Sequence, residues 1–369
     1  MPLQIGIVGL PNAGKSTLFN ALTQANAAVA SYPFTTIEPH VGVAEVPDPR
    51  LDTIAHLINP EKVVPTTIQF VDIAGLVKGA HQGEGLGNQF LAHIREVDAI
   101  ALVLRCFEDP DVAHVSAQLD PLDDLSVLDL ELSLADLGTV ERRIERTQSA
   151  AKSRPKDFEW ELATLDALKE HLARGGAART FSGAGETASD RVQALLAELF
   201  LLTLKPRLLV ANVGEDTLPE GGHLAAKVVE TAAQGGSQSI ILCADCEAAL
   251  AEWPADEAAE YRAELGLSTP GLNRLVGASY RLLDLITFFT VTGGEVVRAW
   301  TLRQGETAWH AAGQVHTDMQ QGFIRADVVA YADLETAGSM AAVREAGRLR
   351  SEGRDYVVQD GDVIHIHFS

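Results

Sequence analysis

The stretch Gly9-Leu10-Pro11-Asn12-Ala13-Gly14-Lys15-Ser16 decides the fold of this chain. It fits the pattern G-x-x-x-x-G-K-[ST], in which the glycines let backbone N–H groups curl around phosphate oxygens with no Cβ in the way. Lys15 would supply a positive charge to the β- and γ-phosphates, and Ser16 a hydroxyl to Mg²⁺. An apolar run at residues 3–8 precedes the loop, and a helix is predicted through 16–22. This context predicts a nucleotide site whose phosphates contact Asn12, Ala13, Gly14, Lys15, Ser16 and Thr17.

Further apolar runs predict the rest of one sheet. They lie at residues 68–71, 99–104, 207–211 and 239–242. Runs that are buried on both faces and separated by helices are typical of a parallel, doubly wound sheet. We therefore predict an α/β P-loop NTPase fold over residues 1–125 and 201–277.

A helical insertion is predicted between two of these strands, because about a hundred residues separate 99–104 from 207–211, far more than a crossover needs. The insertion carries two apolar helix stripes, and Pro155 lies in a break that suits the tip of an antiparallel hairpin. We predict a coiled-coil arm over residues 126–200. The stripes are Leu130, Leu134, Leu137 and Ile144 in one helix, and Phe158, Leu162, Leu165, Leu168 and Leu172 in the other.

The last part of the chain, residues 278–369, has a different pattern. Short β-like runs occur at 296–300, 356–358 and 363–368, with glycine-containing turns between them. This pattern predicts a small, separate α+β domain.

Length and composition favour a multidomain protein of the cytoplasm. The 369 residues suit two or three domains, and 46% apolar with 22% charged residues is typical of globular chains. No apolar run is long enough to span a bilayer, the start lacks a basic signal-peptide region, and three cysteines indicate a reducing compartment. The formal net charge of -22 opposes binding to polyanions, so a nucleic-acid partner would need a locally basic surface.

A magnesium and γ-phosphate site is predicted at Asp72-Ile73-Ala74-Gly75, directly after an apolar run. The Asp72 carboxylate would act on Mg²⁺, and the Gly75 N–H would contact the γ-phosphate. The loop at residues 31–36 is polar and contains a proline, and Thr36 is its candidate hydroxyl. The predicted Mg²⁺ ligands are therefore Ser16, Thr36 and Asp72.

The base site is predicted at Asn212-Val213-Gly214-Glu215, where the related motif N-K-x-D would bind guanine. The aspartate of that motif accepts bonds from guanine N1–H and the 2-amino group, and adenine offers no such pair of donors. Here the carboxylate is one methylene longer and valine replaces lysine, which favours ATP over GTP. The alternative is that Glu215 still accepts guanine. Asn212, Val213 and Glu215 are the predicted contacts, and Cys243 and Ala244 are expected to line the base.

The residue that orients the attacking water is left open. Many enzymes of this kind use a glutamine after D-x-x-G, but this chain has Leu76, which cannot bind water. We therefore expect slow intrinsic turnover, assisted by another group, a cation held by Asn12, or a partner. His81 suits acid–base work, although a loop histidine with no chemical task is an equal alternative. The predicted catalytic residues are Lys15, Thr36, Gly75 and His81.

Four motifs together resemble the YchF / Obg-like ATPase family of the TRAFAC class. They are G-L-P-N-A-G-K-S-T, Y-P-F-T-T-I-E-P, D-I-A-G-L-V-K-G-A-H-Q-G-E-G-L-G-N-Q-F-L and N-V-G-E. The resemblance covers essentially the whole length, and residues 305–326 resemble part of a TGS (ubiquitin-like) domain. It implies a P-loop domain, a coiled-coil arm and a TGS domain over 278–369. It further implies Mg²⁺-dependent ATP hydrolysis, K⁺ stimulation through Asn12 and association with ribosomes.

Basic residues gather at the predicted tip of the arm, where they could reach rRNA or tRNA phosphates, the alternative being a solvated hairpin end. Ribosome association would use this tip and the TGS domain. The leading hypothesis is an ATP-driven switch, and the alternatives are a GTPase with the same cycle or a nucleotide-stabilised RNA or protein scaffold. No membrane partner is expected, and a monomer is favoured with the oligomeric state left open. The basic residues are Arg142, Arg143, Arg146, Lys152, Arg154 and Lys156.

Overall fold

The computed structural model describes residues 3–25, 40–73, 86–109, 119–182 and 189–369. The chain divides into two compact units, one formed by Met1–Gly42 with Gln69–Leu272 and the other by Val43–Ile68 with Asn273–Ser369. None of the helices in the described ranges combines the length and the apolar character needed to span a bilayer.

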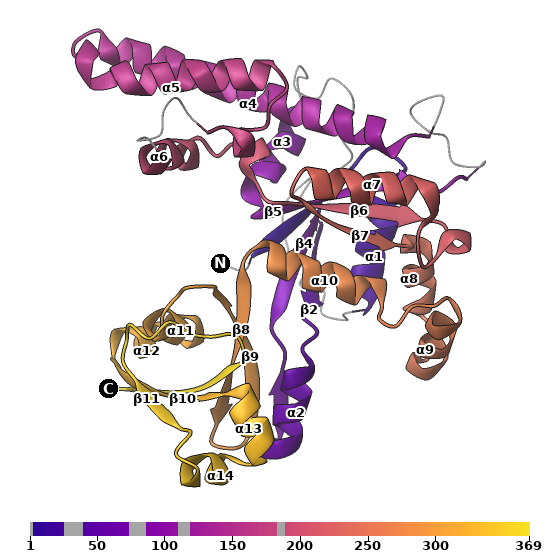
Figure 1. Cartoon of the computed structure of the whole chain (residues 1–369), viewed down its shortest axis with the longest axis vertical. Helices are drawn as coiled ribbons and strands as arrows, with labels where there is room; N and C mark the ends of the chain where they lie inside the picture. Colours follow the sequence, from indigo (N-terminus) through magenta and orange to yellow (C-terminus); the bar gives the residue numbers. More distant parts are fainter. Residues whose placement is uncertain (1–2, 26–39, 74–85, 110–118, 183–188) are drawn as a thin grey trace. The chain divides into compact units, whose positions relative to one another are not determined.

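A six-stranded sheet forms the centre of the first unit, with the strand order β2-β4-β1-β5-β6-β7 (Figure 1). The predicted strands are all present, and the pairs β4–β1, β1–β5, β5–β6 and β6–β7 are parallel, which confirms the P-loop sheet. β5 is buried along its whole length, as expected for a strand covered on both faces. The bounds are β1 Gln4–Val8, β2 His40–Glu45, β4 Thr67–Asp72, β5 Ala99–Cys106, β6 Arg207–Val213 and β7 Gln238–Leu242.

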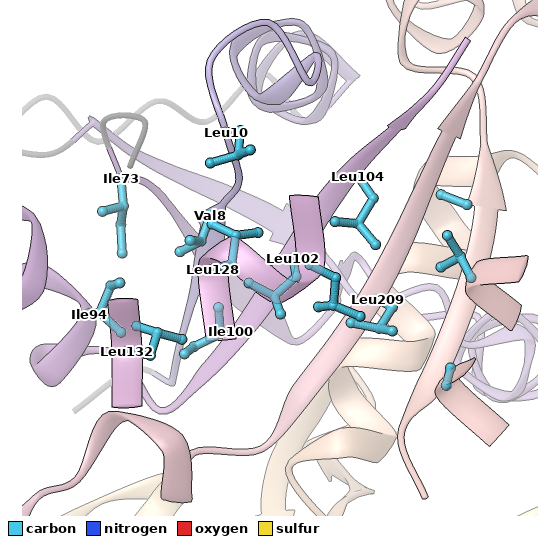
Figure 2. Packing of buried hydrophobic residues seen from close by; sticks show 14 of the residues in the cluster. Val8, Leu10, Ile73, Ile94, Ile100, Leu102, Leu104, Leu128, Leu132 and Leu209 are labelled. Carbon is cyan, nitrogen blue, oxygen red and sulfur yellow. The ribbon is translucent and has the colours of Figure 1, made fainter. Parts of the chain in front are cut away.

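Helices bury the apolar side chains of this sheet. Figure 2 shows one such core, in which Leu102 of β5 and Leu209 of β6 pack near Leu128 and Leu132, together with Ile94. Ile94 comes from α3, and the two leucines at 128 and 132 come from α4. Elsewhere in this unit α1 packs against α8. The helices here are α1 Lys15–Ala25, α3 Leu86–Glu96, α4 Pro121–Ala151, α7 Gly222–Gln234, α8 Ala244–Leu250 and α9 Ala255–Glu264.

The predicted helical hairpin is present in the first unit, where α4 and α5 (Pro155–Ala173) lie side by side (Figure 1). α4 begins at Pro121 because proline suits the first helical turn and the Asp120 side chain accepts a hydrogen bond from Leu122 N. The chain reverses at residues 152–154, within the predicted tip.

One of the two predicted apolar stripes is confirmed only in its second half, where Ile144 is buried and Leu137 packs against the same cluster. Leu130 is 53% exposed, and α4 instead buries Leu128 and Leu132 against the sheet and Val140 within the arm. Leucines occur on several faces of α4, so their spacing fits more than one stripe, and only packing against the sheet selects between them. The stripe on α5 is confirmed, and its buried members are Leu165, Leu168 and Leu172.

The root of the arm is fixed by a buried carboxylate. Asp136, in the middle of α4, is fully buried and accepts hydrogen bonds from Leu202 N at 2.7 Å, Thr203 N at 2.8 Å and Thr203 Oγ1 at 2.7 Å. Both donor residues lie in the 3-10 helix η3 (Leu202–Leu204), which follows α6 (Ser189–Leu199) and precedes β6. Asp136 therefore joins the outgoing helix of the arm to its return segment.

The second unit is built on a mixed six-stranded sheet with the order β11-β10-β12-β8-β9-β3, which agrees with the predicted α+β class. Residues 46–66, which connect β2 to β4 and which we expected in the first domain, belong to this unit. They contribute β3 (Lys62–Val64), which pairs with β9 in parallel, and α2 (Pro49–Ile58), which buries Leu51 and Ile54.

The prediction of a strand at residues 356–358 is wrong. Only Val357 forms a bridge, with Thr307. Asp362 accepts hydrogen bonds from Gln359 N and the Tyr356 hydroxyl, which join this segment to Asp362. The remaining elements are α10 Gly271–Leu282, β8 Leu285–Thr292, β9 Val296–Arg303, α11 Ala308–Val315, α12 Thr317–Gln321, β10 Phe323–Ala330, α13 Tyr331–Ala337, α14 Met340–Glu345, β11 Arg350–Glu352 and β12 Asp362–Phe368.

Candidate functional site

The phosphate loop runs from the end of β1 into α1, as its motif predicts. Asn12 and Gly14 have left-handed backbone, with φ angles of 63° and 90°. A Cβ on Gly9 would lie 2.4 Å from the carbonyl oxygen of Val103, and one on Gly14 would lie 2.1 Å from Nδ2 of Asn212. Because Val103 and Asn212 are held in buried strands, both loop positions require glycine.

Lys15 starts α1 and is 7% exposed, with its Nζ donating to the carbonyl oxygen of Leu10 at 2.9 Å. Burial lowers the pKa of Lys15, and the negative charge of Asp72 opposes this shift. The ammonium group is thus held within the loop, where it is placed to attract phosphate oxygens.

Asp72 lies at the end of β4, in register with Ile7 of β1, and this brings its carboxylate to the phosphate loop. A side-chain hydrogen bond joins it to Ser16. Burial raises the pKa of Asp72, while Lys15, His40 and the bond to Ser16 act in the opposite direction. Carboxylate and hydroxyl oxygens are the ligands that Mg²⁺ prefers, so Asp72 and Ser16 fit the predicted magnesium site.

Asn212 joins the phosphate loop to the loop after β7. Its Nδ2 donates to the carbonyl oxygen of Ala13 at 3.0 Å, and its Oδ1 accepts from Ala244 N at 2.9 Å. Asn212 is 2% exposed and Ala244 is fully buried, so both bonds are shielded from water. The structure therefore brings together the predicted base-site residues Asn212 and Ala244 and the predicted phosphate-site residue Ala13.

Glu215 leads the 3-10 helix η4 (Glu215–Thr217) and is exposed. The Tyr261 hydroxyl donates to its Oε1, and the Cys246 thiol lies 3.9 Å from its Oε2. The hydrogen bond to Glu215 raises the pKa of Tyr261, so the phenol remains protonated and acts as the donor. The sequence does not reveal this role of Tyr261, because no motif marks it and it lies 46 residues from its partner.

The other predicted residues take different positions. Cys243 caps the start of α8, where its Sγ accepts from Cys246 N at 3.2 Å, and both sulfurs belong to free thiols. Val213 is buried in the core of the first unit rather than exposed at the base site. Thr17 is half-buried in the first turn of α1.

Several predicted residues of the γ-phosphate site lie outside the described residues. They are Thr36, Gly75, Leu76 and His81.

Comparisons with known proteins give consistent matches along the chain. A family model described as "50S ribosome-binding GTPase" matches residues 4–135, and the model YchF-GTPase_C, described as "Protein of unknown function (DUF933)", matches residues 285–369. The chain is 51% identical over 371 residues to the protein named ribosome-binding ATPase YchF of Bacillus subtilis, and 49% identical to that of Escherichia coli O157:H7, with 100% of both chains covered in each case.

A solved structure is similar over nearly the whole length. It is the YchF GTPase of Schizosaccharomyces pombe, with a TM-score of 0.85 and 34% sequence identity, covering 99% of this chain and 97% of the other. The similarity includes both units described above.

Proposed function

The chain belongs to the YchF family, and on this premise we propose that it is a Mg²⁺-dependent ATPase that acts as a molecular switch and associates with the ribosome. The observation that supports this most is the bridge made by Asn212, which ties the phosphate loop at Ala13 to the base-site loop at Ala244. Such a bridge suits a site that holds phosphates and base at the same time.

The phosphate end of the proposed site is formed by Lys15, Ser16 and Asp72. The Lys15 ammonium would leave the carbonyl oxygen of Leu10 and bind the β- and γ-phosphates. Ser16 and Asp72, with Thr36, would hold Mg²⁺, which supplies positive charge to the phosphates when bound. The Gly75 N–H would contact the γ-phosphate, so that its loss on hydrolysis changes the surrounding loops.

Glu215 would determine whether the site prefers adenine or guanine. Its carboxylate is oriented by contacts with Tyr261 and Cys246 rather than by the paired donors of guanine, which supports ATP as the substrate. GTP is the second candidate, because a carboxylate is retained at this position and the S. pombe relative is named a GTPase.

Hydrolysis is expected to be slow without a stimulating factor. Leu76 stands where a water-orienting glutamine would be expected. We propose that K⁺ held by Asn12, together with a ribosomal partner, assists the reaction, and that His81 takes part in proton transfer.

Ribosome association would involve the tip of the arm. Arg142, Arg146, Lys152, Arg154 and Lys156 are exposed there, and their positive charge suits rRNA phosphates. Arg143 forms ion pairs within the arm instead, with Glu161 at 2.8 Å and with Glu198 at 3.1 Å. We propose that residues 278–369 act as a TGS domain with a second contact, and that the protein works as a monomer in the cytoplasm.

The test is phosphate release from ATP and from GTP by the purified chain, with Mg²⁺, in K⁺ or Na⁺, and with or without ribosomes. We expect ATP hydrolysis that rises with K⁺ and with ribosomes and is lost in Lys15→Ala. Turnover of GTP alone would replace the ATPase by a GTPase. Negligible turnover under every condition would support the scaffold alternative.

A further inference from the structure

We propose that Tyr261 is a specificity-determining residue, whose hydroxyl holds the carboxylate of Glu215 in an orientation that excludes guanine. This inference rests on the proposed function, because it explains how the site would select ATP. Tyr261 lies outside the nucleotide motifs, on α9, and would act by positioning Glu215.

Two donors from neighbouring helices occupy the carboxylate of Glu215. The Tyr261 hydroxyl donates to Oε1 from α9, and the Cys246 thiol approaches Oε2 from α8 at 3.9 Å. The phenol makes the stronger of the two contacts, because a thiol is a weak donor. The carboxylate is therefore held toward α8 and α9 mainly by Tyr261.

The Tyr261 ring is itself fixed in place. Its ring centroid lies 5.4 Å from that of Trp253, and the next residue, Arg262, approaches the Glu247 carboxylate at 4.0 Å. Glu247 in turn accepts a hydrogen bond from Gly271 N at 2.6 Å. The ring contact with Trp253 and the charge attraction between Arg262 and Glu247 both restrict the position of α9, from which the phenol meets Glu215.

The turn after α9 adds a further support. Gly266 lies so close to Pro219 that a Cβ on Gly266 would be 3.3 Å from the Pro219 Cγ. Pro219 closely follows η4, the short helix that begins with Glu215. Both partners of the Tyr261–Glu215 bond are therefore carried by segments that contact each other.

The chemistry of the two bases makes this arrangement selective. Guanine recognition needs both carboxylate oxygens to accept, one from N1–H and one from the 2-amino group, whereas adenine presents an acceptor at N1 and no 2-amino group. Each oxygen keeps a second lone pair, so the exclusion comes from orientation: facing Tyr261, the two oxygens do not both reach guanine N1–H and the 2-amino group unless this hydrogen bond breaks. Adenine requires no such change, so the tyrosine hydroxyl penalises GTP and leaves ATP unaffected.

The experiment compares the affinities of Tyr261→Phe and the wild type for ATP, GTP and inosine triphosphate in Mg²⁺ and K⁺. We expect Tyr261→Phe to bind GTP at least about fivefold more tightly than the wild type does, which is the scale of one released hydrogen bond to a charged group. The affinity for ATP should change by less than about twofold. Inosine triphosphate lacks the 2-amino group and should gain less than GTP.

Tyr331→Phe is the matched control, because the Tyr331 hydroxyl also donates to a glutamate, Glu335, at 2.6 Å on the second unit. It should leave all three affinities unchanged. A double mutant tests whether the effect of Tyr261 depends on Glu215. Tyr261→Phe placed in a Glu215→Ala background should have no effect on GTP, because the group it positions is gone.

The outcomes separate this inference from the proposed function. A wild type that prefers GTP overturns the ATPase proposal, whatever the variant does. A wild type that prefers ATP, combined with an unchanged GTP affinity in Tyr261→Phe or an equal loss for both nucleotides, overturns the role of Tyr261 alone.

Discussion

The Asn212 side chain donates a hydrogen bond to the carbonyl oxygen of Ala13 across 199 residues of sequence, at a distance of 3.0 Å. The same side chain accepts from Ala244 N, so one buried amide fixes the spacing between the phosphate loop and the base-site loop. An asparagine can do this because its side chain carries a donor and an acceptor side by side.

Asn212→Ala should therefore weaken both fold and function. Two buried backbone groups lose their partners, which costs about 2 kcal/mol or more of unfolding free energy, and ATP affinity should fall at least about tenfold. Asn212→Asp keeps the acceptor for Ala244 N but places an oxygen against the carbonyl of Ala13. Chemical denaturation and nucleotide titration measure both effects, and an Asn212→Asp variant with wild-type affinity would contradict this role.

Gly14→Ala should disrupt the phosphate loop. Its Cβ would lie 2.1 Å from Nδ2 of Asn212, at a backbone φ of 90° that alanine rarely adopts, so we expect loss of detectable ATP binding. Gly138→Ala is the matched control within α4, where the nearest neighbour is the end of the Arg142 side chain at 3.6 Å. That variant should stabilise the protein by about 0.5–1 kcal/mol and bind ATP normally. Calorimetry of both variants measures their stability and their affinity for ATP.

Asp136→Asn should loosen the root of the arm. The new amide cannot accept from both Thr203 donors and the Leu202 N–H, so we expect a loss of about 1–3 kcal/mol in stability, measured by chemical denaturation at pH 7. Burial raises the pKa of Asp136 above its ordinary 3.8, so the folded state binds this proton more tightly than the unfolded state. The stability of the wild type relative to Asp136→Asn should therefore increase as the pH falls through the folded pKa toward 3.8. If the stability of the wild type relative to Asp136→Asn decreases as the pH falls over this range, the pKa of Asp136 is not raised by folding.

Charge reversal at the arm tip should weaken ribosome binding. Lys152→Glu with Lys156→Glu removes exposed positive charge, so affinity should fall, and the slope of its logarithm against the logarithm of salt concentration should decrease by about one unit for each phosphate that is no longer neutralised. Arg174→Glu is the control, because Arg174 is also exposed on the same arm but pairs with Glu170 at the other end of α5. Cosedimentation with ribosomes over a salt series measures these slopes. Equal effects of the tip and control substitutions would argue against ribosome binding through the tip.

The sheet and the phosphate loop could be predicted because their signals are local. A buried apolar run followed by G-x-x-x-x-G-K-S and a helix specifies β1, the loop and α1 within one continuous segment. Asp72 and Asn212 follow the same logic, since each ends a predicted strand, and the carboxyl ends of parallel strands meet at one edge of a sheet.

The features that sequence did not predict depend on long-range packing. β3 joins the second unit because it pairs with β9, more than two hundred residues later, and nothing near residues 62–64 indicates that partner. The leucines of α4 fit more than one stripe until the sheet selects Leu128 and Leu132. Tyr261 gains its role only when α9 brings it to Glu215.

A competition titration in Mg²⁺ and K⁺ tests most directly whether the base site selects adenine. Unlabelled ATP and GTP would each displace a fluorescent ATP analogue from the purified protein. We predict that ATP competes at least about tenfold better than GTP, a difference of about 1.4 kcal/mol in binding free energy. If GTP competes equally well or better, the base site with Glu215 does not select adenine, and the chain must be regarded as a GTPase.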